Sequence, residues 1–281
     1  MKVVQMLKAD FVKALVAEDV GRGDLFARIT ESAPVEAFVV AKSDGVFAGR
    51  EYLEAMEMVF EIGFRWYIDD GERFEKGKVL FEVFGDSRQI LSLERSVLDI
   101  VLHASGIATV TRRYADRIEP YGCRLLDTRK TRPMLREFEK YAVRCGGGSN
   151  HRMGLDDCLM LKDTHLRTIS DLGEFMKDIR KKIPFTAKIE IECEDMDMIR
   201  DAMRAGADIV MCDNMSPEEI AEAVRYRDEN YPHVLMEASG NVTLETIEEI
   251  ARTGVDAISS GSIIHQATWP DLSMRVKSVE E

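Results

Sequence analysis

A chain of 281 residues, of which 45% are hydrophobic and 32% charged, has the composition of an ordinary globular protein. It is long enough for one large α/β domain or for two smaller ones. The formal net charge of -13 and the lack of a face rich in lysine, arginine and aromatic residues argue against nucleic acid as a partner. The longest apolar runs fall far short of the roughly 20 residues that span a bilayer, so we expect no membrane partner either.

The N-terminal residues and the cysteines both predict a reducing compartment. The first ten residues lack the apolar core and the small-residue cleavage site of a signal peptide. The five cysteines form no C-x-x-C pair, and an odd number without metal spacing indicates reduced thiols. We therefore predict a cytoplasmic protein, with a catalytic thiol as a minor alternative. The cysteines are Cys123, Cys145, Cys158, Cys193 and Cys212.

The first part of the chain, up to about residue 105, mixes one leading helix with short strands. Apolar, β-branched and aromatic residues predict strands at residues 37–41 and 79–83. Residues 69–77 between them have turn composition. A long amphipathic stretch, residues 90–118, then predicts a helix that leads into the second part.

From Cys123 onward, strand and helix patterns alternate. Strands are expected at residues 124–127, 158–162, 187–192, 208–213, 234–239 and 257–261, and helices at 172–181, 197–205, 217–227 and 244–252. Repeated strand–helix units with buried strands predict parallel pairing through right-handed crossovers. Six such strands without a pause favour most of a (β/α) barrel over an open doubly wound sheet.

Cationic side chains follow several of these expected strands, at the edge where barrel enzymes form their active sites. Arg129 and Lys130 follow the first strand, Lys162 ends the second, and Arg152 lies between them. In a chain of negative net charge, such a cluster indicates an anionic ligand with carboxylate or phosphate groups.

The remaining strand ends carry two other kinds of chemistry. Glu192 and Asp213 supply negative charge for a developing cation, for Mg²⁺ or for sugar hydroxyls. The small residues of Ser239-Gly240-Asn241 and Ser260-Gly261-Ser262 are typical of the phosphate cradle of (β/α) barrels. Together the three groups predict a phosphorylated sugar that reacts with an organic anion.

Simpler interpretations stand beside these. A single cation at a strand end is often only a solvated surface charge. Glu192 can pair with Lys188 or with Lys162 in a structural network. Lys130 or Lys162 is also a candidate Schiff-base lysine, which would make the protein a different kind of barrel enzyme.

Taken in order, these residues resemble those of the quinolinate phosphoribosyltransferases, also called nicotinate-nucleotide pyrophosphorylases (carboxylating). The resemblance is carried by the segments Asp127-Thr128-Arg129-Lys130-Thr131, Glu139-Lys140-Tyr141-Ala142-Val143, Gly146-Gly147-Gly148, Asn150-His151-Arg152 and Lys162-Asp163. It extends over nearly the whole chain, through Glu94-Arg95, Glu190-Ile191-Glu192, Cys212-Asp213-Asn214-Met215 and Glu237-Ala238-Ser239-Gly240.

The resemblance implies a type II phosphoribosyltransferase fold. It implies an N-terminal α/β sandwich, residues 1–107 with 266–281, and an incomplete α/β barrel, residues 108–265. The implied reaction joins quinolinate to phosphoribosyl pyrophosphate with Mg²⁺ and gives nicotinate mononucleotide, CO₂ and pyrophosphate, in the de novo synthesis of NAD. Subunits would pair as a homodimer or a homohexamer, so that the sandwich of one covers the barrel mouth of the other.

The resemblance also implies a role for each site residue. Arg129, His151, Arg152 and Lys162 would hold quinolinate, with Arg95 reaching in from the partner subunit. Lys130 would face phosphoribosyl pyrophosphate, Thr128 would be a further substrate-binding residue, and Lys130, Glu192 and Asp213 would be catalytic. Glu192 and Asp213 would lie at the ribose and its Mg²⁺, and Ser239, Gly240, Asn241, Ser260, Gly261 and Ser262 would hold the 5′-phosphate.

Four positions depart from the family pattern. Asn241 stands where a second glycine is common, Ser260 and Ser262 replace common valine and alanine, and Thr164 replaces a frequent asparagine.

Two rival functions are less favoured. A transferase specific for nicotinate, a monocarboxylate, would leave part of the cationic clamp unpaired. A non-catalytic sensor would be expected to have lost Glu192 or Asp213.

Overall fold

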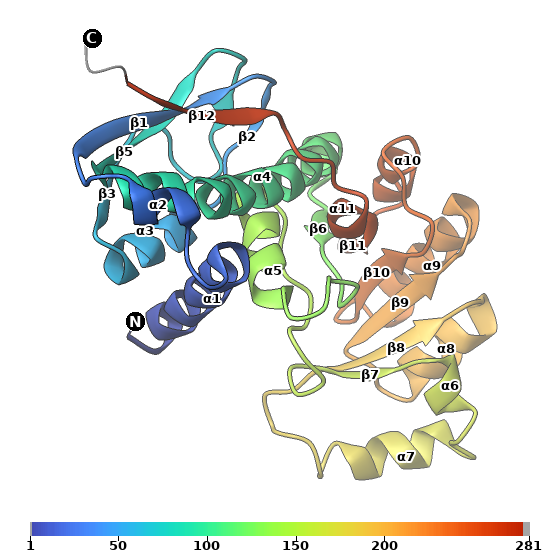
Figure 1. Cartoon of the computed structure of the whole chain (residues 1–281). Coiled ribbons are helices and arrows are strands. Elements are labelled where there is room, and N and C mark those ends of the chain that lie inside the picture. Colours follow the sequence, from blue (N-terminus) through green and yellow to red (C-terminus); the bar gives the residue numbers. More distant parts are fainter. Residues whose placement is uncertain (1, 278–281) are drawn as a thin grey trace. The chain divides into compact units, whose positions relative to one another are not determined.

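The computed structural model describes residues 2–277 and contains two compact units (Figure 1). The antiparallel unit is formed by the residues up to Val110, by residues 144–146 and by the segment from Ala267 onward. The parallel unit is formed by Thr111–Val143 and Gly147–Gln266. No helix among the described residues is both long enough and apolar enough to cross a membrane.

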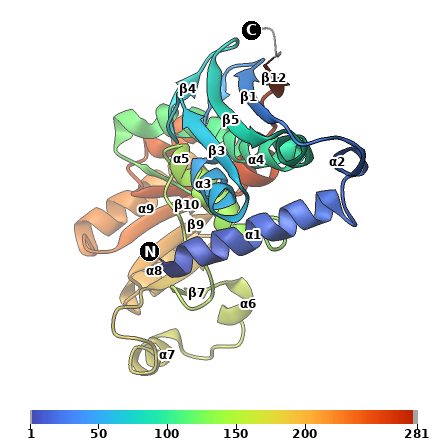
Figure 2. The same cartoon turned by 60° about the vertical axis from the view of Figure 1, so that its left-hand side comes forward.

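The antiparallel unit is built on a four-stranded sheet in the order β12-β1-β5-β3 (Figure 2). All of its pairings are antiparallel, and β1 lies between β5 and β12. The strands are β1 (Pro34–Ala41), β3 (Ile62–Trp66), β5 (Val79–Asp86) and β12 (Leu272–Val276), and a separate pair joins β2 (Gly45–Val46) to β4 (Arg73–Phe74).

Alternating apolar residues bury one face of this sheet. In β1, Val39 and Ala41 are buried while the residue between them is only half-buried. The rings of Phe64, Trp66 and Phe81 pack against one another on β3 and β5, with centroids 5.1 to 5.8 Å apart. These rings supply much of the apolar area that holds the unit together.

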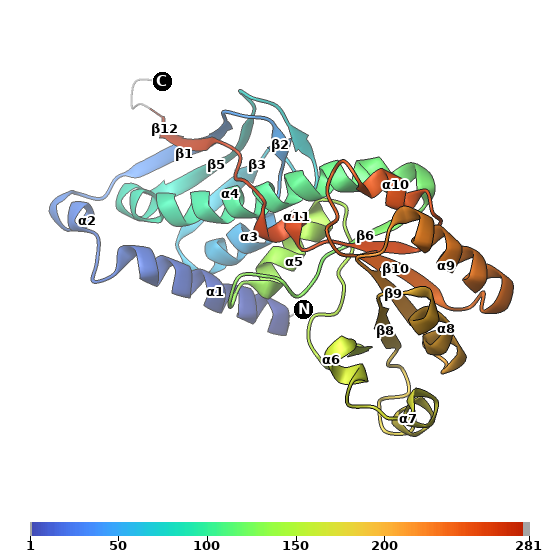
Figure 3. The ribbon, with the colours of Figure 1, turned by 90° about the vertical axis from the view of Figure 1, so that its right-hand side faces the viewer.

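Four helices belong to the antiparallel unit: α1 (Lys2–Val20), α2 (Leu25–Ile29), α3 (Arg50–Val59) and α4 (Ser87–Ile118) as far as Val110. Helix α4 runs beside the sheet in Figures 1 and 3. Its hydroxyl groups satisfy backbone amides near β2. Thr109 Oγ1 accepts a hydrogen bond from the Val46 amide at 2.8 Å, and Ser105 Oγ accepts one from the Ala48 amide at 3.1 Å.

The parallel unit holds a six-stranded sheet in the order β6-β11-β10-β9-β8-β7, and every pairing in it is parallel. The strands are β6 (Arg124–Leu126), β7 (Leu159–Leu161), β8 (Ile189–Cys193), β9 (Ile209–Asp213), β10 (Leu235–Ser239) and β11 (Ala257–Ser259). The first strand, β6, pairs with the last, β11, as it would in a barrel. Within residues 2–277 no pairing joins β6 to β7, so the barrel is incomplete.

Helices cover this sheet, as a parallel sheet requires. The unit contains α5 (Arg136–Cys145, as far as Val143), α6 (Asp163–Leu166), α7 (Leu172–Ile179), α8 (Met196–Arg204), α9 (Pro217–Asn230), α10 (Ile247–Ala251) and α11 (Ser262–His265). Helix α8 contacts β8 and β9, α10 contacts β11, and α9 packs between α8 and α10 (Figure 3). The strands carry successive buried residues, such as Val210, Met211 and Cys212 in β9, because both faces of the sheet are covered.

The sequence explains where the longer of these helices begin. Ser216 and Glu219 form a capping box at the start of α9, with Pro217 in its first turn. The side chain of Asp195 accepts a hydrogen bond from the Met198 amide at 2.8 Å and caps α8. These caps place α8 directly after β8 and α9 directly after β9.

The structure confirms the α/β fold class and all six predicted strands of the second part, with ends that differ by one or two residues. The helix expected over 244–252 is only Ile247–Ala251, because Thr243 and Thr246 bond to each other in the preceding turn. Residues 69–77 include the short strand β4 besides the expected turns. The sequence did not predict α5, α6 and α11, of which the last two are single turns of helix.

Candidate active site

The carboxyl ends of the six parallel strands share one edge of the sheet, and a cavity of about 280 Å³ lies there. All six strands contribute to it, either directly or through the residues that follow them. The lining residues are Thr128, Arg129, Lys130, His151, Arg152, Met160, Lys162, Glu192, Met211, Ser239 and Ser259. Eight of these are predicted site residues, and Met160, Met211 and Ser259 are not. The cavity therefore has four lysine and arginine side chains against a single carboxylate.

The two arginines of the cavity crowd each other. Burial, and then repulsion from Arg152 and Arg136, lowers the pKa of Arg129. Arg152 donates from Nη1 to the backbone oxygen of Cys158 at 3.1 Å, which holds its guanidinium beside β7. Because an anion between the two guanidinium groups would relieve their repulsion, this wall is suited to carboxylate or phosphate groups.

Lys162 and Glu192 form an ion pair within the cavity, with Nζ 2.5 Å from Oε2. This is one of the structural pairings that the sequence left open for Glu192. Asp213, at the end of β9, does not line the cavity but lies close to Glu192. Burial, and then the charge of Glu192, raises the pKa of Asp213. Two carboxylates that repel each other in this way would be stabilised by a divalent cation.

The ends of β9 and β10 are tied together by asparagine side chains. Asn241 donates from Nδ2 to Asn214 Oδ1 at 3.0 Å, and Asn214 donates to Asp213 Oδ2 at 2.8 Å. Gly240 has a φ of +92°, and a Cβ there would lie 2.2 Å from Asn214 Oδ1. Only glycine therefore fits between the two strand ends. Ser239 lines the cavity, whereas Gly240 and Asn241 lie outside its lining.

The end of β11 contributes Ser259 to the cavity, while the predicted residues Ser260, Gly261 and Ser262 do not line it. The hydroxyls of Ser260 and Ser262 lie 2.7 Å apart and hydrogen-bond to each other. A Cβ on Gly261 would approach Thr128 Oγ1 and Lys130 Cδ to 3.2 and 3.1 Å, so a larger residue would press on these two cavity residues.

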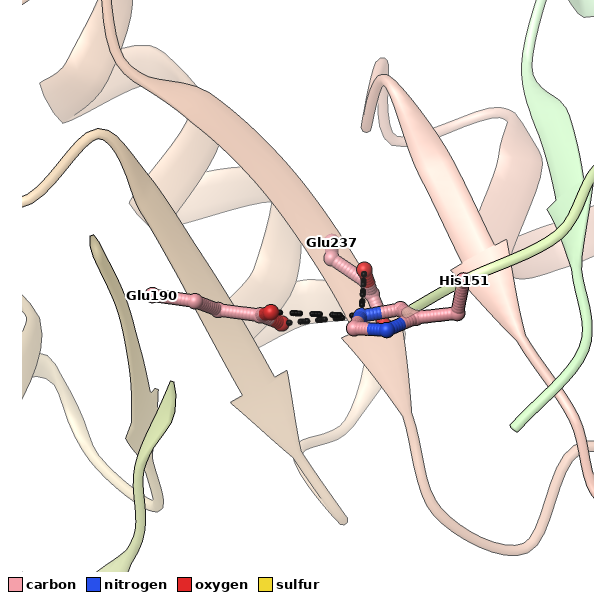
Figure 4. Close-up of side chains that lie close together, drawn as sticks. All are labelled: His151, Glu190 and Glu237. Carbon is pink, nitrogen blue, oxygen red and sulfur yellow. Dashed lines mark hydrogen bonds and ion pairs between the residues drawn. The ribbon is translucent and has the colours of Figure 1, made fainter. Parts of the chain in front are cut away.

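His151 lies over two buried carboxylates, Glu190 of β8 and Glu237 of β10 (Figure 4). Its Nε2 atom is 3.2 Å from Glu190 Oε2 and 3.3 Å from Glu237 Oε2. Burial alone would lower the pKa of His151, but the hydrogen bonds to both carboxylates outweigh it and raise the pKa to about 10. Burial raises the pKa of Glu190. The cluster therefore retains protons at neutral pH.

The contact made by Nδ1, the second nitrogen of the His151 ring, shows where the ring proton lies. The Arg152 amide donates to His151 Nδ1 at 2.7 Å, so that atom is an acceptor and carries no proton. We therefore assign the ring proton to Nε2, and any further proton of the cluster to a carboxyl group. On this geometric ground we describe His151 as a neutral ring, even though the two carboxylates favour the charged form.

A second buried network holds the segment before Arg152. Asp127 and Lys140 form a fully buried ion pair, and Asp127 also accepts from Asn150 Nδ2 at 2.6 Å and from the His151 amide at 2.9 Å. Lys140 Nζ also donates to the His151 backbone oxygen at 3.0 Å. The neighbouring residue Glu139 is buried as well, and its carboxylate accepts hydrogen bonds from the backbone amide and from Nη1 of Arg132.

The sequence did not assign a site role to Asp127, Lys140, Glu190 or Glu237. A signal for Glu190 was present, because it stands two residues before Glu192 in an apolar strand and a strand places such residues on the same face. For Glu237 a charge inside an otherwise apolar strand was the only sign, and Lys140, in a segment with several other charged residues, gave none.

Arg95, the remaining predicted site residue, lies on α4 in the antiparallel unit. Its side chain is 57% exposed, and Nη1 lies 3.4 Å from Asp99 Oδ1, one helical turn away. It is not among the lining residues of the cavity.

The fold and the cavity together define the class of protein. The parallel sheet presents a strongly cationic cavity at the edge where barrel enzymes bind their substrates, with two neighbouring carboxylates beside it. This is the site of an α/β-barrel enzyme that binds anionic substrates.

Comparison with known proteins gives the family. Residues 24–105 match the N-terminal domain of quinolinate phosphoribosyl transferase, and residues 107–275 match its C-terminal domain. A probable nicotinate-nucleotide pyrophosphorylase (carboxylating) of Methanothermobacter thermautotrophicus is 38% identical over 277 residues, which cover 96% of this chain and 99% of that protein. A probable enzyme of the same name from Bacillus subtilis is 39% identical over 271 residues, 94% of this chain and 93% of that protein.

A solved structure agrees with these relatives. The nicotinate-nucleotide pyrophosphorylase of Francisella tularensis has a TM-score of 0.91 and 34% sequence identity to this chain, and the match covers 97% of both chains. The chain belongs to the quinolinate phosphoribosyltransferase family.

Proposed function

We propose that this protein is a quinolinate phosphoribosyltransferase (decarboxylating). It joins quinolinate to phosphoribosyl pyrophosphate and releases nicotinate mononucleotide, CO₂ and pyrophosphate, a step of NAD biosynthesis. The observation that carries the proposal is the cavity itself, where Arg129, Lys130, Arg152 and Lys162 face a single lining carboxylate. Both substrates are polyanions, and such a cavity offsets the charge that would otherwise keep them apart.

Quinolinate binds to the cationic wall of the cavity. Arg129, Arg152 and Lys162 take its two ring carboxylates, with His151 in the same wall, and the ring nitrogen is left facing the ribose. In the proposed oligomer, the partner subunit's Arg95 completes the clamp. Its exposure on α4 supports this role, since an arginine that reaches another subunit must lie at the surface.

Phosphoribosyl transfer forms a bond between the ring nitrogen and C1′ and breaks the bond from C1′ to the pyrophosphate oxygen. Positive charge develops on the ribose, and Glu192 and Asp213 stabilise it. Lys130 and Thr128 face the pyrophosphate that leaves with the bonding electrons. Nitrogen substitution makes the ring cationic, so it can stabilise the electron pair left on C2 when the adjacent carboxylate departs as CO₂, and a proton from water then bonds to C2.

Glu192 and Asp213 also fit Mg²⁺, because hard cations prefer carboxylate oxygens and because burial, and then the charge of Glu192, raises the pKa of Asp213. When bound, the ion would offset negative charge on the pyrophosphate. The 5′-phosphate is assigned to the ends of β10 and β11. The residues are Ser239, Gly240, Asn241, Ser260, Gly261 and Ser262.

We further propose the domain boundaries, the assembly state and the compartment of the protein. Residues 1–107 with 266–281 form a sandwich domain and 108–265 the barrel domain. The protein works as a homo-oligomer, and it works in the cytoplasm, which the lack of a disulfide among its five cysteines supports.

The test incubates the purified protein with quinolinate, phosphoribosyl pyrophosphate and Mg²⁺, and follows CO₂ release and nicotinate mononucleotide. We expect turnover with quinolinate, none with nicotinate, and loss of activity when EDTA removes the metal. Turnover with nicotinate alone would contradict the two-carboxylate clamp. A covalent adduct trapped by borohydride on Lys130 or Lys162 would instead show a Schiff-base enzyme.

A further inference from the structure

His151 is held at its backbone and at its ring. Its amide donates to Asp127 Oδ1 at 2.9 Å, and its carbonyl oxygen accepts from Lys140 Nζ at 3.0 Å. Its ring is fixed through Nε2 by Glu190 and Glu237 (Figure 4). Asp127, Lys140 and Glu190 are fully buried, and Glu237 is only 2% exposed. Four buried charged residues thus contact His151 and restrict its position.

Glu237 is the most telling of these four. Its Oε1 atom is buried and has no hydrogen-bond partner, and His151 is the one polar contact of the Glu237 side chain among the described residues. Burying a carboxylate costs several kcal/mol unless it is paired, so Glu237 in β10 destabilises the fold apart from its contact with His151. That contact is therefore the role that we assign to Glu237.

The other ring nitrogen of His151 is also occupied. Nδ1 accepts the Arg152 amide at 2.7 Å, so neither nitrogen is left to bind a substrate. Arg152, whose backbone amide the ring holds, does line the cavity, and its guanidinium has N–H groups beyond the two that bond to the Cys158 oxygen and to Met160 Sδ. We infer that Glu190 and Glu237 are positioning residues, which fix the His151 ring so that it holds the Arg152 backbone, and that His151 acts on the bound anion through Arg152.

A metal site is the alternative that a histidine and two carboxylates would allow, since the three ligand atoms lie within 4.8 Å of one another. A metal on Nε2 would need the ring proton on Nδ1. That proton would then face the Arg152 amide hydrogen, with the two nitrogens 2.7 Å apart. The geometry therefore favours positioning over metal binding.

The first test reads the ring proton directly. In wild-type protein labelled with ¹⁵N-histidine, loss of one signal pair in the His151→Asn variant identifies His151. We expect a proton on Nε2 and none on Nδ1, with the same pattern after quinolinate is added. A proton on Nδ1, as in a metal-bound or charged ring, would overturn the inference, and so would a change of tautomer on quinolinate binding.

The second test asks whether Glu237 acts through Arg152. We expect Glu237→Gln to raise the Kd for quinolinate about tenfold in the wild-type background and to have little further effect in Arg152→Ala, because the two residues serve one contact. Glu190→Gln should behave in the same way and provides a second route if Glu237→Gln folds poorly. Equal effects in both backgrounds would mean that the glutamates do not act through Arg152.

A control variant and the ligand-free measurement separate this inference from other causes of weakened binding. Glu229→Gln makes the same chemical change on the exposed face of α9 and should leave the Kd unchanged. The inference rests on the proposed function only where it names quinolinate as the anion. The tautomer of the ligand-free protein needs no substrate, so its failure would overturn the inference alone, whereas a wild-type protein without quinolinate turnover would overturn the proposed function.

Discussion

At the scale of single residues, Arg152 places its guanidinium in the wall of the cavity, while its backbone amide is held by the His151 ring. We expect Arg152→Ala to cost roughly 2–5 kcal/mol of quinolinate binding, because it removes a bidentate charged partner from a partly buried site. Calorimetric titration of quinolinate into both proteins measures this difference. Arg152→Lys should recover only part of the loss, since lysine lacks the planar fork. Unchanged quinolinate affinity in Arg152→Ala would remove Arg152 from the clamp.

The thiols give a pH-dependent prediction. Burial raises the pKa of Cys158 to about 11 and that of Cys123 and Cys212 to about 12, and burial raises the pKa of Cys193 further. A raised pKa favours the neutral thiol, so at pH 8 only about one Cys158 in a thousand is a reactive thiolate.

We therefore expect native protein at pH 8 to react with Ellman's reagent at no more than Cys145, and at all five cysteines once it is unfolded. Reactivity should rise as the pH approaches 11, while the protein remains folded. Cys158→Ser should keep its turnover. Loss of activity in that variant, or fast modification of Cys158 at pH 8, would revive the catalytic-thiol alternative.

Many of the cavity residues were predictable because they directly follow strands that the sequence pattern identifies. Parallel strands bring their carboxyl ends to one edge, so Arg129, Lys162 and Glu192 had to come together once the strands were recognised. Lys140 and Glu237 could not be assigned in this way. A buried charge depends on partners distant in sequence, and sequence patterns read such residues as surface positions or interruptions.

At the scale of elements, helix α5 is unusual because two consecutive charged residues, Glu139 and Lys140, are fully buried on it. Burial lowers the pKa of Lys140 and raises that of Asp127, and the pairing between them opposes both shifts. Glu139 binds Arg132 before the helix, while Lys140 binds the segments that carry Asp127 and His151. Helix α5 thus fastens both loops that line the cationic wall.

We expect Lys140→Met to lower the free energy of unfolding by about 3–5 kcal/mol, since it leaves Asp127 buried without its ionic partner. Urea unfolding measures the change. Lys181→Met, at an exposed position, is the matched control and should stay within about 0.5 kcal/mol of the wild type. A loss in Lys140→Met no larger than in the control would show that the buried pair contributes nothing to stability.

Elements were predicted best where the apolar pattern is long and its ends are marked. The strands of the parallel sheet are mainly apolar runs, and helices α8 and α9 have clear N-caps. Helices α6 and α11 are single turns of four residues, too short for any periodic pattern. Helix α5 was missed because its buried charges break the expected apolar stripe.

At the scale of the whole molecule, the proposed oligomer makes a prediction that a monomeric enzyme could not satisfy. Arg95→Ala and Lys162→Ala should each be inactive, because each lacks one part of a site built from two subunits. When the two variants are mixed and allowed to exchange subunits, about a quarter of the wild-type activity should return. Half of the dimers are then hybrids, and each hybrid has one intact site of two.

Activity of the exchanged mixture, measured by CO₂ release, checks this expectation. The wild-type protein taken through the same exchange is the control for losses in handling. A mixture that stays inactive while the subunits are shown to exchange would place Arg95 and Lys162 in the same subunit's site, or Arg95 in none.

Both sheets are completed only by residues that come late in the chain. Strand β12, residues Leu272–Val276, pairs with β1 and forms an edge of the antiparallel sheet, and β11 is the strand that pairs with β6, whose other pairing is a single bridge from Leu126 to Ser149. On the ribosome, β1 and β6 therefore emerge long before these two late partners exist, and one edge of each strand remains unpaired through most of synthesis. Neither unit can finish folding co-translationally from its own first strands. Nascent chains halted before residue 257 should depend on chaperones, while the released protein should fold late and both sheets together.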